Sequence, residues 1–193
     1  MREGLLRTSI RMSWGREFST FVENQDPRER MKQGDRLLCV LDDWYRSLPA
    51  SYQPVNVTMN ANPNTVFPPI WIHPMTHAGA IQMYHFARTA VMLNQPTMGG
   101  TWNLHATVKT VCGIANSCQE HEPAMAFVNV QALFAGQSIR NLVVIVTNHF
   151  QVGRFVRSSE MRNELLSILS KMLRISGFPA KRLIARLKKD WEE

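Results

Sequence analysis

Three histidines come closest to a metal-binding pattern in this sequence. His73 and His77 are four positions apart, and His85 follows two helical turns later. Imidazoles at i and i+4 on a helix can share one metal ion. Pro74 lies between the first two, however, and no cysteine or carboxylate nearby in sequence completes a shell of four ligands. We therefore interpret the histidines as polar groups at and after a helix start, and we expect no metal or other cofactor.

An acidic pair, Asp42 and Asp43, lies in an apolar helical pattern and is similar to the paired acids that hold magnesium in helical prenyl-diphosphate enzymes. Such a site needs a third acid one turn later, where this chain has Arg46. Charge on the outer face of a helix is the default, so both aspartates are predicted to face solvent. The sequence also lacks a glycine-rich phosphate loop, a G-x-S-x-G turn and an H-E-x-x-H helix. We expect no enzymatic activity.

The three cysteines are too few and too scattered for a disulfide scaffold or a zinc knuckle. Cys39, Cys112 and Cys118 lie on the apolar faces of predicted helices, where free cysteine packs as a small hydrophobic residue. Their odd number favours a reducing compartment. No apolar run reaches the roughly 18 residues of a membrane span, and charges interrupt the N-terminal region where a secretory leader would lie. We expect a soluble intracellular chain.

Helices are the elements that must position these residues. Apolar residues recur at helical spacing over six stretches: 31–48 (starting near Pro27), 74–94, 104–119, a stretch from Pro123, 158–177 and 179–191. Prolines and asparagines between 50 and 73 predict an extended connector, whose apolar end at 67–72 packs against the body. Leu142–Val146 is a β-prone run without a partner strand. The sequence predicts an all-α fold, an irregular bundle of about five to six helices.

The net charge of +7 lies mainly at the C-terminal end. Residues 161–193 hold eight Lys or Arg against four Asp or Glu, whereas residues 37–160 hold six against five. In the last predicted helix the apolar positions fall on one side and the basic positions on the other. The basic residues are Lys181, Arg182, Arg186, Lys188 and Lys189. A solvent-facing surface is favoured; a nuclear import patch or nucleic-acid contact, and a membrane-surface helix, are the alternatives.

Several strings in the middle of the chain carry a family resemblance. LDDWYRSLPASYQPV (Leu41–Val55), FPPIWIHPMTHAGAIQMYHFARTAVMLNQP (Phe67–Pro96) and CGIANSCQEHEPAMAFVNVQALFAGQSI (Cys112–Ile139) occur in that order. Together they resemble the regulatory domain of fungal binuclear zinc-cluster transcription factors, over about residues 35–140 and more loosely over 161–191. The matched core comprises Trp44, Tyr45, Pro49, Trp71, His73, Pro74, His77, Tyr84 and Arg88, most of which we expect to be structural.

The resemblance implies a nuclear, all-α domain that is part of a larger helical regulatory domain and regulates transcription through protein partners of the transcription machinery. Family members carry a cluster of six cysteines that holds zinc and reads DNA. This chain has three cysteines, none clustered, so we do not expect it to bind nucleic acid directly. Residues 1–30 match the family poorly, and residues 31–193 form the predicted regulatory domain.

Residues 142–159 depart from the family pattern and are interpreted as an insertion, either a loop or translated intron sequence. Two other interpretations of the chain remain as alternatives. One is a helical small-molecule-binding domain or enzyme, with a pocket around His73, His77 and His85. The other is an incomplete gene product, which would expose apolar patches where helices should pack.

Overall fold

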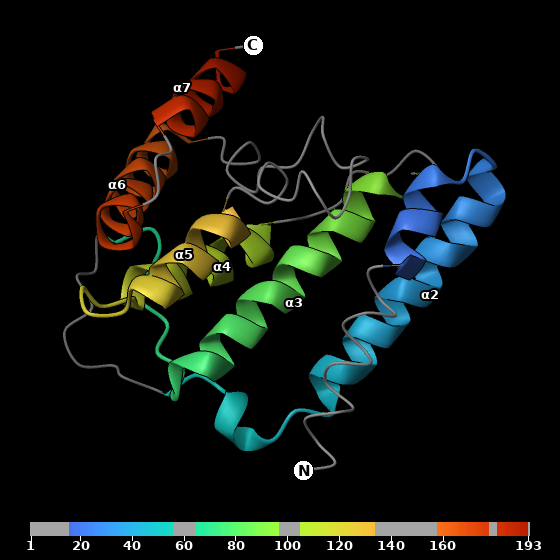
Figure 1. The fold of residues 1–193 in the computed structure, drawn as a ribbon, viewed down its shortest axis with the longest axis horizontal. Coiled ribbons are helices and arrows are strands. Elements are labelled where there is room, and N and C mark those ends of the chain that lie inside the picture. The colour runs from blue at the N-terminus through green and yellow to red at the C-terminus, as the bar shows by residue number, and fades with distance from the viewer. Residues whose placement is uncertain (1–15, 56–64, 97–104, 134–157, 178–180, 193) are drawn as a thin grey trace.

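The computed structural model describes residues 16–55, 65–96, 105–133, 158–177 and 181–192. In these ranges the chain is helical and contains no strand, only an isolated antiparallel bridge between Val55 and Trp71. Residues 16–23 form a first helix. It is followed by α2 (Pro27–Arg46), the short 3-10 helix η1 (Ala50–Tyr52), α3 (Met75–Asn94), α4 (His105–Ser117), α5 (Pro123–Leu133), α6 (Ser159–Ser176) and α7 (Lys181–Asp190) (Figure 1). The prediction of an all-α fold is confirmed.

Local capping explains where several helices start and end. Asp26 accepts a hydrogen bond from the backbone N–H of Arg28, and Pro27 occupies the first turn of α2, where a missing N–H costs nothing. Ser158 accepts from the N–H of Met161 at the start of α6. Gly177 ends α6 with φ of 67°, a left-handed conformation that glycine adopts without steric cost.

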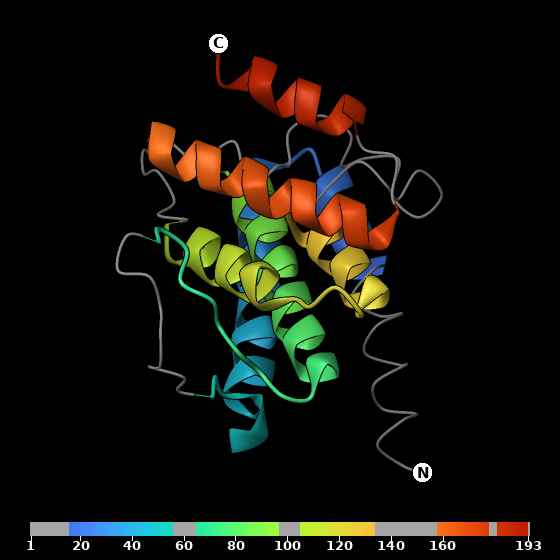
Figure 2. The same cartoon turned by 90° about the vertical axis from the view of Figure 1, so that its left-hand side faces the viewer.

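Helix α3 is the centre of the fold. It contacts α2 on one side and both α4 and α5 on the other, and α6 in turn covers α4 and α5 (Figure 1). Figure 2 shows α7 lying outside α6, so that the helices form successive layers. Nine of the twenty residues of α3 are buried, which agrees with its apolar sequence and its central position.

Three clusters of buried apolar side chains hold these layers together. The largest joins α4, α5, α6 and α7 around Phe67, which is fully buried. The second lies between α2 and α3, and the third joins η1, α3 and α4 around Ile72 and Ile114. Full burial of a Val, Leu, Ile, Phe or Met side chain stabilises a fold by about 1.5–3 kcal/mol relative to leaving that side chain exposed.

The helix at 16–23 packs against α2 and α3. Phe18 and Phe21 are buried in the second cluster, where they pack with Leu37 of α2 and Val91 of α3. Helix α2 begins at Pro27, where the sequence predicts a helix start. The described part of residues 1–30 therefore belongs to the same hydrophobic core as the rest.

The apolar end of the connector packs against the body, as predicted, whereas Ala50–Tyr52 of the predicted extended stretch forms η1 and residues 56–64 lie outside the described ranges. The carboxylate of Glu164 in α6 accepts hydrogen bonds from the backbone N–H groups of Val66 and Phe67, at 2.8 and 3.0 Å. Asn116 donates to the carbonyl oxygen of Phe67, and the N–H of Ile70 donates to the carbonyl oxygen of Gly113. These bonds place Phe67 in the main core. Leu142–Val146, and residues 142–157 of the predicted insertion, lie outside the described residues.

Candidate functional site

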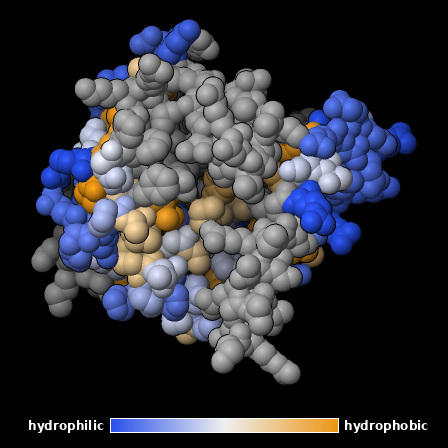
Figure 3. Space-filling view, in the orientation of Figure 1, coloured by the Kyte–Doolittle hydropathy of each residue, from blue (hydrophilic) through white to orange (hydrophobic). Residues whose placement is uncertain are grey.

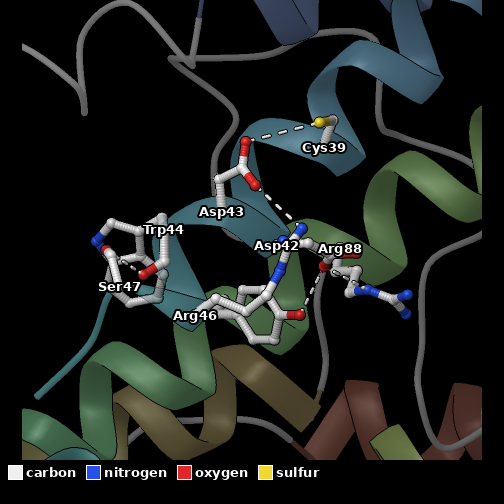
Figure 4. A network of polar contacts seen from close by, with 8 residues as sticks. Cys39, Asp42, Asp43, Trp44, Arg46, Ser47 and Arg88 are labelled. Carbon is white, nitrogen blue, oxygen red and sulfur yellow. Dashed lines mark hydrogen bonds and ion pairs between the residues drawn. The ribbon is translucent and has the colours of Figure 1, made fainter.

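Asp42 joins α2 to α3 through two hydrogen bonds to one oxygen. The hydroxyl of Tyr84 donates to Asp42 Oδ1 at 2.7 Å, and Arg88 Nε donates to the same oxygen at 3.0 Å. Figure 4 shows the carboxylate of Asp42 directed toward Arg88. The prediction that Asp42 faces solvent is wrong, because this carboxylate lies on the side of α2 that meets α3 and is only about one-third exposed.

Helical spacing explains why two donors reach one carboxylate. Tyr84 and Arg88 are four residues apart on α3, so their side chains lie on the same face one turn from each other. Burial, and then the hydrogen bond to Asp42, raises the pKa of Tyr84 above its ordinary value. The phenol therefore stays protonated at neutral pH and serves as a donor. Arg88 also donates to the sulfur of Met92 at 3.3 Å, which fixes the guanidinium along α3.

Asp43, the second residue of the acidic pair, does face solvent. It forms an ion pair with Arg46 at 3.0 Å on the exposed side of α2, and Cys39 Sγ donates to its other carboxylate oxygen at 3.7 Å (Figure 4). Cys39 is exposed, so the prediction of core packing is wrong for this cysteine, one turn before Asp43. It is confirmed for Cys112 and Cys118, which are buried and whose thiol pKa values are raised by that burial.

Aromatic rings surround the Asp42 contact. Tyr45 stacks on Tyr84 with ring centroids 4.4 Å apart, and Trp44 lies 6.1 Å from Tyr84. His85 meets Tyr84 edge-on at 5.0 Å, and its Nδ1 atom is buried without a hydrogen-bond partner. Burial, and then the positive charge of Arg88, lowers the pKa of His85 to about 4. His85 is therefore neutral at pH 7.

The remaining residues of the matched core lie around η1. His77 stacks on Tyr52 with ring centroids 3.7 Å apart, and its Nδ1 lies 3.1 Å from the carbonyl oxygen of Ser51. Pro49 precedes η1, Trp71 bridges to Val55, and His73 and Pro74 are exposed just before α3.

His77 and His85 thus have separate aromatic partners, on η1 and on α2 respectively. Within the described ranges, no group of three or more His, Cys, Asp or Glu residues has an arrangement that could hold a metal ion. The geometry gives these two histidines packing roles.

A buried amide pair in the centre of the fold was missed by the sequence analysis. Gln82 Nε2 donates to the carbonyl oxygen of Val111 and to Asn129 Oδ1, both at 2.9 Å, and Asn129 donates to the sulfur of Met172 at 3.6 Å. Both amide side chains are fully buried, and Gln82 Oε1 has no partner. One signal was available: Gln82 is a polar residue within a helix that is apolar on most sides.

The apolar side of α7 is packed against the core. Leu187 is buried in the main cluster, with Ile184 and Trp191 against its edge. The guanidinium of Arg162 lies 5.2 Å from the centre of the Trp191 ring, a distance at which a cation is attracted to an aromatic face. This packing weakens the membrane-surface interpretation of the helix, because Leu187 is buried and Ile184 and Trp191 are partly buried against the main cluster.

The structure describes the side chains of two of the five basic residues of the last helix. Lys188 and Lys189 are exposed, while the side chains of Lys181, Arg182 and Arg186 lie outside the description. All five positions belong to α7.

In chemical terms, the Asp42 contact is a polar cross-link between two helices. One carboxylate oxygen of Asp42 accepts from both α3 donors, and Tyr45 of α2 stacks on the ring of Tyr84. Comparison of the chain with protein-family models, curated proteins and solved structures finds no match. Among the described helices, none combines the length and apolar character needed to cross a bilayer.

Proposed function

We propose that this chain is a helical regulatory domain that acts on transcription in the nucleus of a fungus, through contacts with proteins of the transcription machinery. It resembles the domain found in zinc-cluster factors and carries no DNA-reading cluster of its own. We do not propose an enzymatic activity.

One observation supports the proposal more than the others. Tyr45 comes from the first matched string, and Tyr84 and Arg88 come from the second. In the structure Tyr45 stacks on Tyr84, while Asp42 of the first string receives hydrogen bonds from both α3 residues. Residues singled out by the resemblance thus form one interface between α2 and α3, as expected of strings that belong to a single folded unit.

A reporter assay tests the proposal. The chain is fused to an unrelated DNA-binding domain and expressed in a fungal cell whose reporter gene carries that domain's target site. We expect reporter output to change by several fold relative to the DNA-binding domain alone. A fluorescent fusion of the chain alone should accumulate in the nucleus.

Two variants separate function from folding in this assay. Asp42→Asn weakens the α2–α3 contact and should reduce the effect, whereas Lys32→Gln, at an exposed lysine on α2, should leave it intact. Unchanged reporter output from a folded, nuclear fusion at normal abundance would refute the proposal.

A further inference from the structure

The basic residues of α7 are segregated on one arc of the helix. Successive residues are rotated by about 100°, so the positions opposite Leu187 follow from the sequence alone. They are Lys181, Arg182, Ala185, Arg186, Lys188 and Lys189. Every position except Ala185 is basic. An averaged charge for the C-terminal region does not reveal this separation, because Asp190, Glu192 and Glu193 reduce the total.

The packing of α7 fixes which arc faces outward. Leu187 is 1% exposed and lies among the buried side chains of α6, and Trp191 is held by Arg162 of the same helix. The helix positions opposite Leu187 therefore lie on the side of α7 that faces away from the core. Lys188, Lys189 and Ala185 are exposed, and neither lysine forms an ion pair with a residue that the structure describes. Figure 3 shows hydrophilic residues at the end of α7, at the top of the view.

We propose that this outward arc of α7 binds the phosphate backbone of nucleic acid without reading its sequence. The ten-residue helix is about 15 Å long. Duplex DNA carries about one negative charge per 1.7 Å with both strands counted, so a stretch of that length offers more phosphates than the arc has basic positions. The small side chain of Ala185 at the centre of the arc allows the helix to approach closely.

The same features disfavour an acidic protein segment as the partner. An exposed ion pair contributes about 0–1 kcal/mol, and protein interfaces gain most of their affinity from buried aromatic and apolar anchors. The outward arc has no apolar position beyond Ala185, and Leu187, Ile184 and Trp191 pack against the main cluster. Binding to the phosphate backbone of nucleic acid needs no apolar anchor, because the release of condensed counterions supplies the free energy of binding.

This inference goes beyond the proposed function and revises the expectation that the chain does not bind nucleic acid. Phosphate contacts hold and orient a protein on a duplex, but they carry no sequence information. A regulatory domain with such a helix would be retained near DNA, while the choice of target site would be made elsewhere.

Fluorescence anisotropy of a labelled 20-base-pair duplex, titrated with the full chain from 50 to 200 mM NaCl, tests this inference. Each neutralised phosphate contributes about −0.9 to the slope of log K against log salt concentration. Five contacts predict a slope of about −4.5, which is a loss of affinity of about 500-fold over this range. A duplex of shuffled sequence should bind equally well.

Matched variants assign the binding to α7. Lys188→Gln with Lys189→Gln should make the slope less steep by about 2, while Lys188→Arg with Lys189→Arg should retain it. Lys32→Gln, which removes an exposed lysine from α2, should leave the slope unchanged. Circular dichroism confirms that each variant keeps its helical content.

Three results would overturn the inference: a slope shallower than about −2, a slope that the double Gln variant does not alter, or a marked preference for one duplex sequence. A poly-glutamate peptide that binds more tightly than the duplex at equal salt would instead assign the arc to acidic proteins. The reporter assay uses an unrelated DNA-binding domain, so either proposal can fail while the other stands.

Discussion

His85 should make the protein less stable in mild acid. In the folded chain its imidazole lies against Tyr84 and Tyr45 and near the guanidinium of Arg88, and its pKa is lowered to about 4 from an ordinary 6.5. The unfolded chain therefore binds more protons than the folded chain between these two values. The free energy of unfolding accordingly falls as the pH is lowered through this window. The contribution that comes from neutral His85 is fully present only above pH 6.5.

The magnitude follows from the size of the pKa shift. One pKa unit corresponds to about 1.4 kcal/mol, so a shift from 6.5 to about 4 removes roughly 3 kcal/mol of stability once the pH is below 4. Most of this loss falls between pH 7 and pH 5, where we expect a decrease of about 2 kcal/mol. A change of that size is a large part of the 5–15 kcal/mol that typically stabilises a domain.

Urea denaturation followed by circular dichroism at pH 7, 6 and 5 measures this effect. His85→Leu replaces the imidazole with an apolar side chain and removes a buried nitrogen that has no partner, so its stability at pH 7 should change by less than about 1 kcal/mol. The variant should lose about 2 kcal/mol less than the natural chain between pH 7 and pH 5. If both chains lose stability equally, His85 does not carry the acid sensitivity and the reasoning is wrong.

Three further predictions concern stability, each measured by the same denaturation assay. Asp42→Asn should lower the free energy of unfolding by about 1–2 kcal/mol, with a coupling to Arg88→Ala of about 0.5–1 kcal/mol; additive effects would show that the bond contributes nothing. Gly113→Ala should cost about 1–3 kcal/mol because its Cβ would lie 2.7 Å from a backbone carbonyl oxygen, whereas Gly79→Ala, with 3.4 Å of clearance, should be tolerated; equal effects would contradict the packing. Glu164→Ala should cost about 1–3 kcal/mol by leaving two backbone N–H groups without their acceptor, and Glu164→Gln should cost less.

The helices could be predicted from the sequence because their signals are local. Ser158 and Gly177 lie at the two ends of α6, and each acts on its own turn of helix. Proline limits α3 in the same way, before Met75 and after Asn94. Such signals need no knowledge of where the rest of the chain lies.

The Asp42 contact could not be predicted in this way, because it depends on how two distant helices face each other. Forty-two residues separate Asp42 from Tyr84, and an aspartate beside a second aspartate looks like a solvent-facing pair. Phe18 and Phe21 were missed for a related reason: charged and apolar residues are mixed before Pro27, and only the packing against α2 and α3 shows which of them are buried. In each case tertiary contacts decide what the local pattern leaves open.

The hydrogen bonds from the backbone N–H groups of Val66 and Phe67 to Glu164 constrain the order in which the protein can fold. The two backbone partners of Glu164 are 98 and 97 residues away in the sequence, so closing this contact is entropically costly and must await synthesis of α6. The contact of α2 with α3 and with the helix at 16–23 requires only residues up to about 95, and can form earlier on the ribosome. A product that ends before residue 159 would therefore leave Phe67 and the inner faces of α4 and α5 uncovered, as a surface for aggregation or for capture by chaperones.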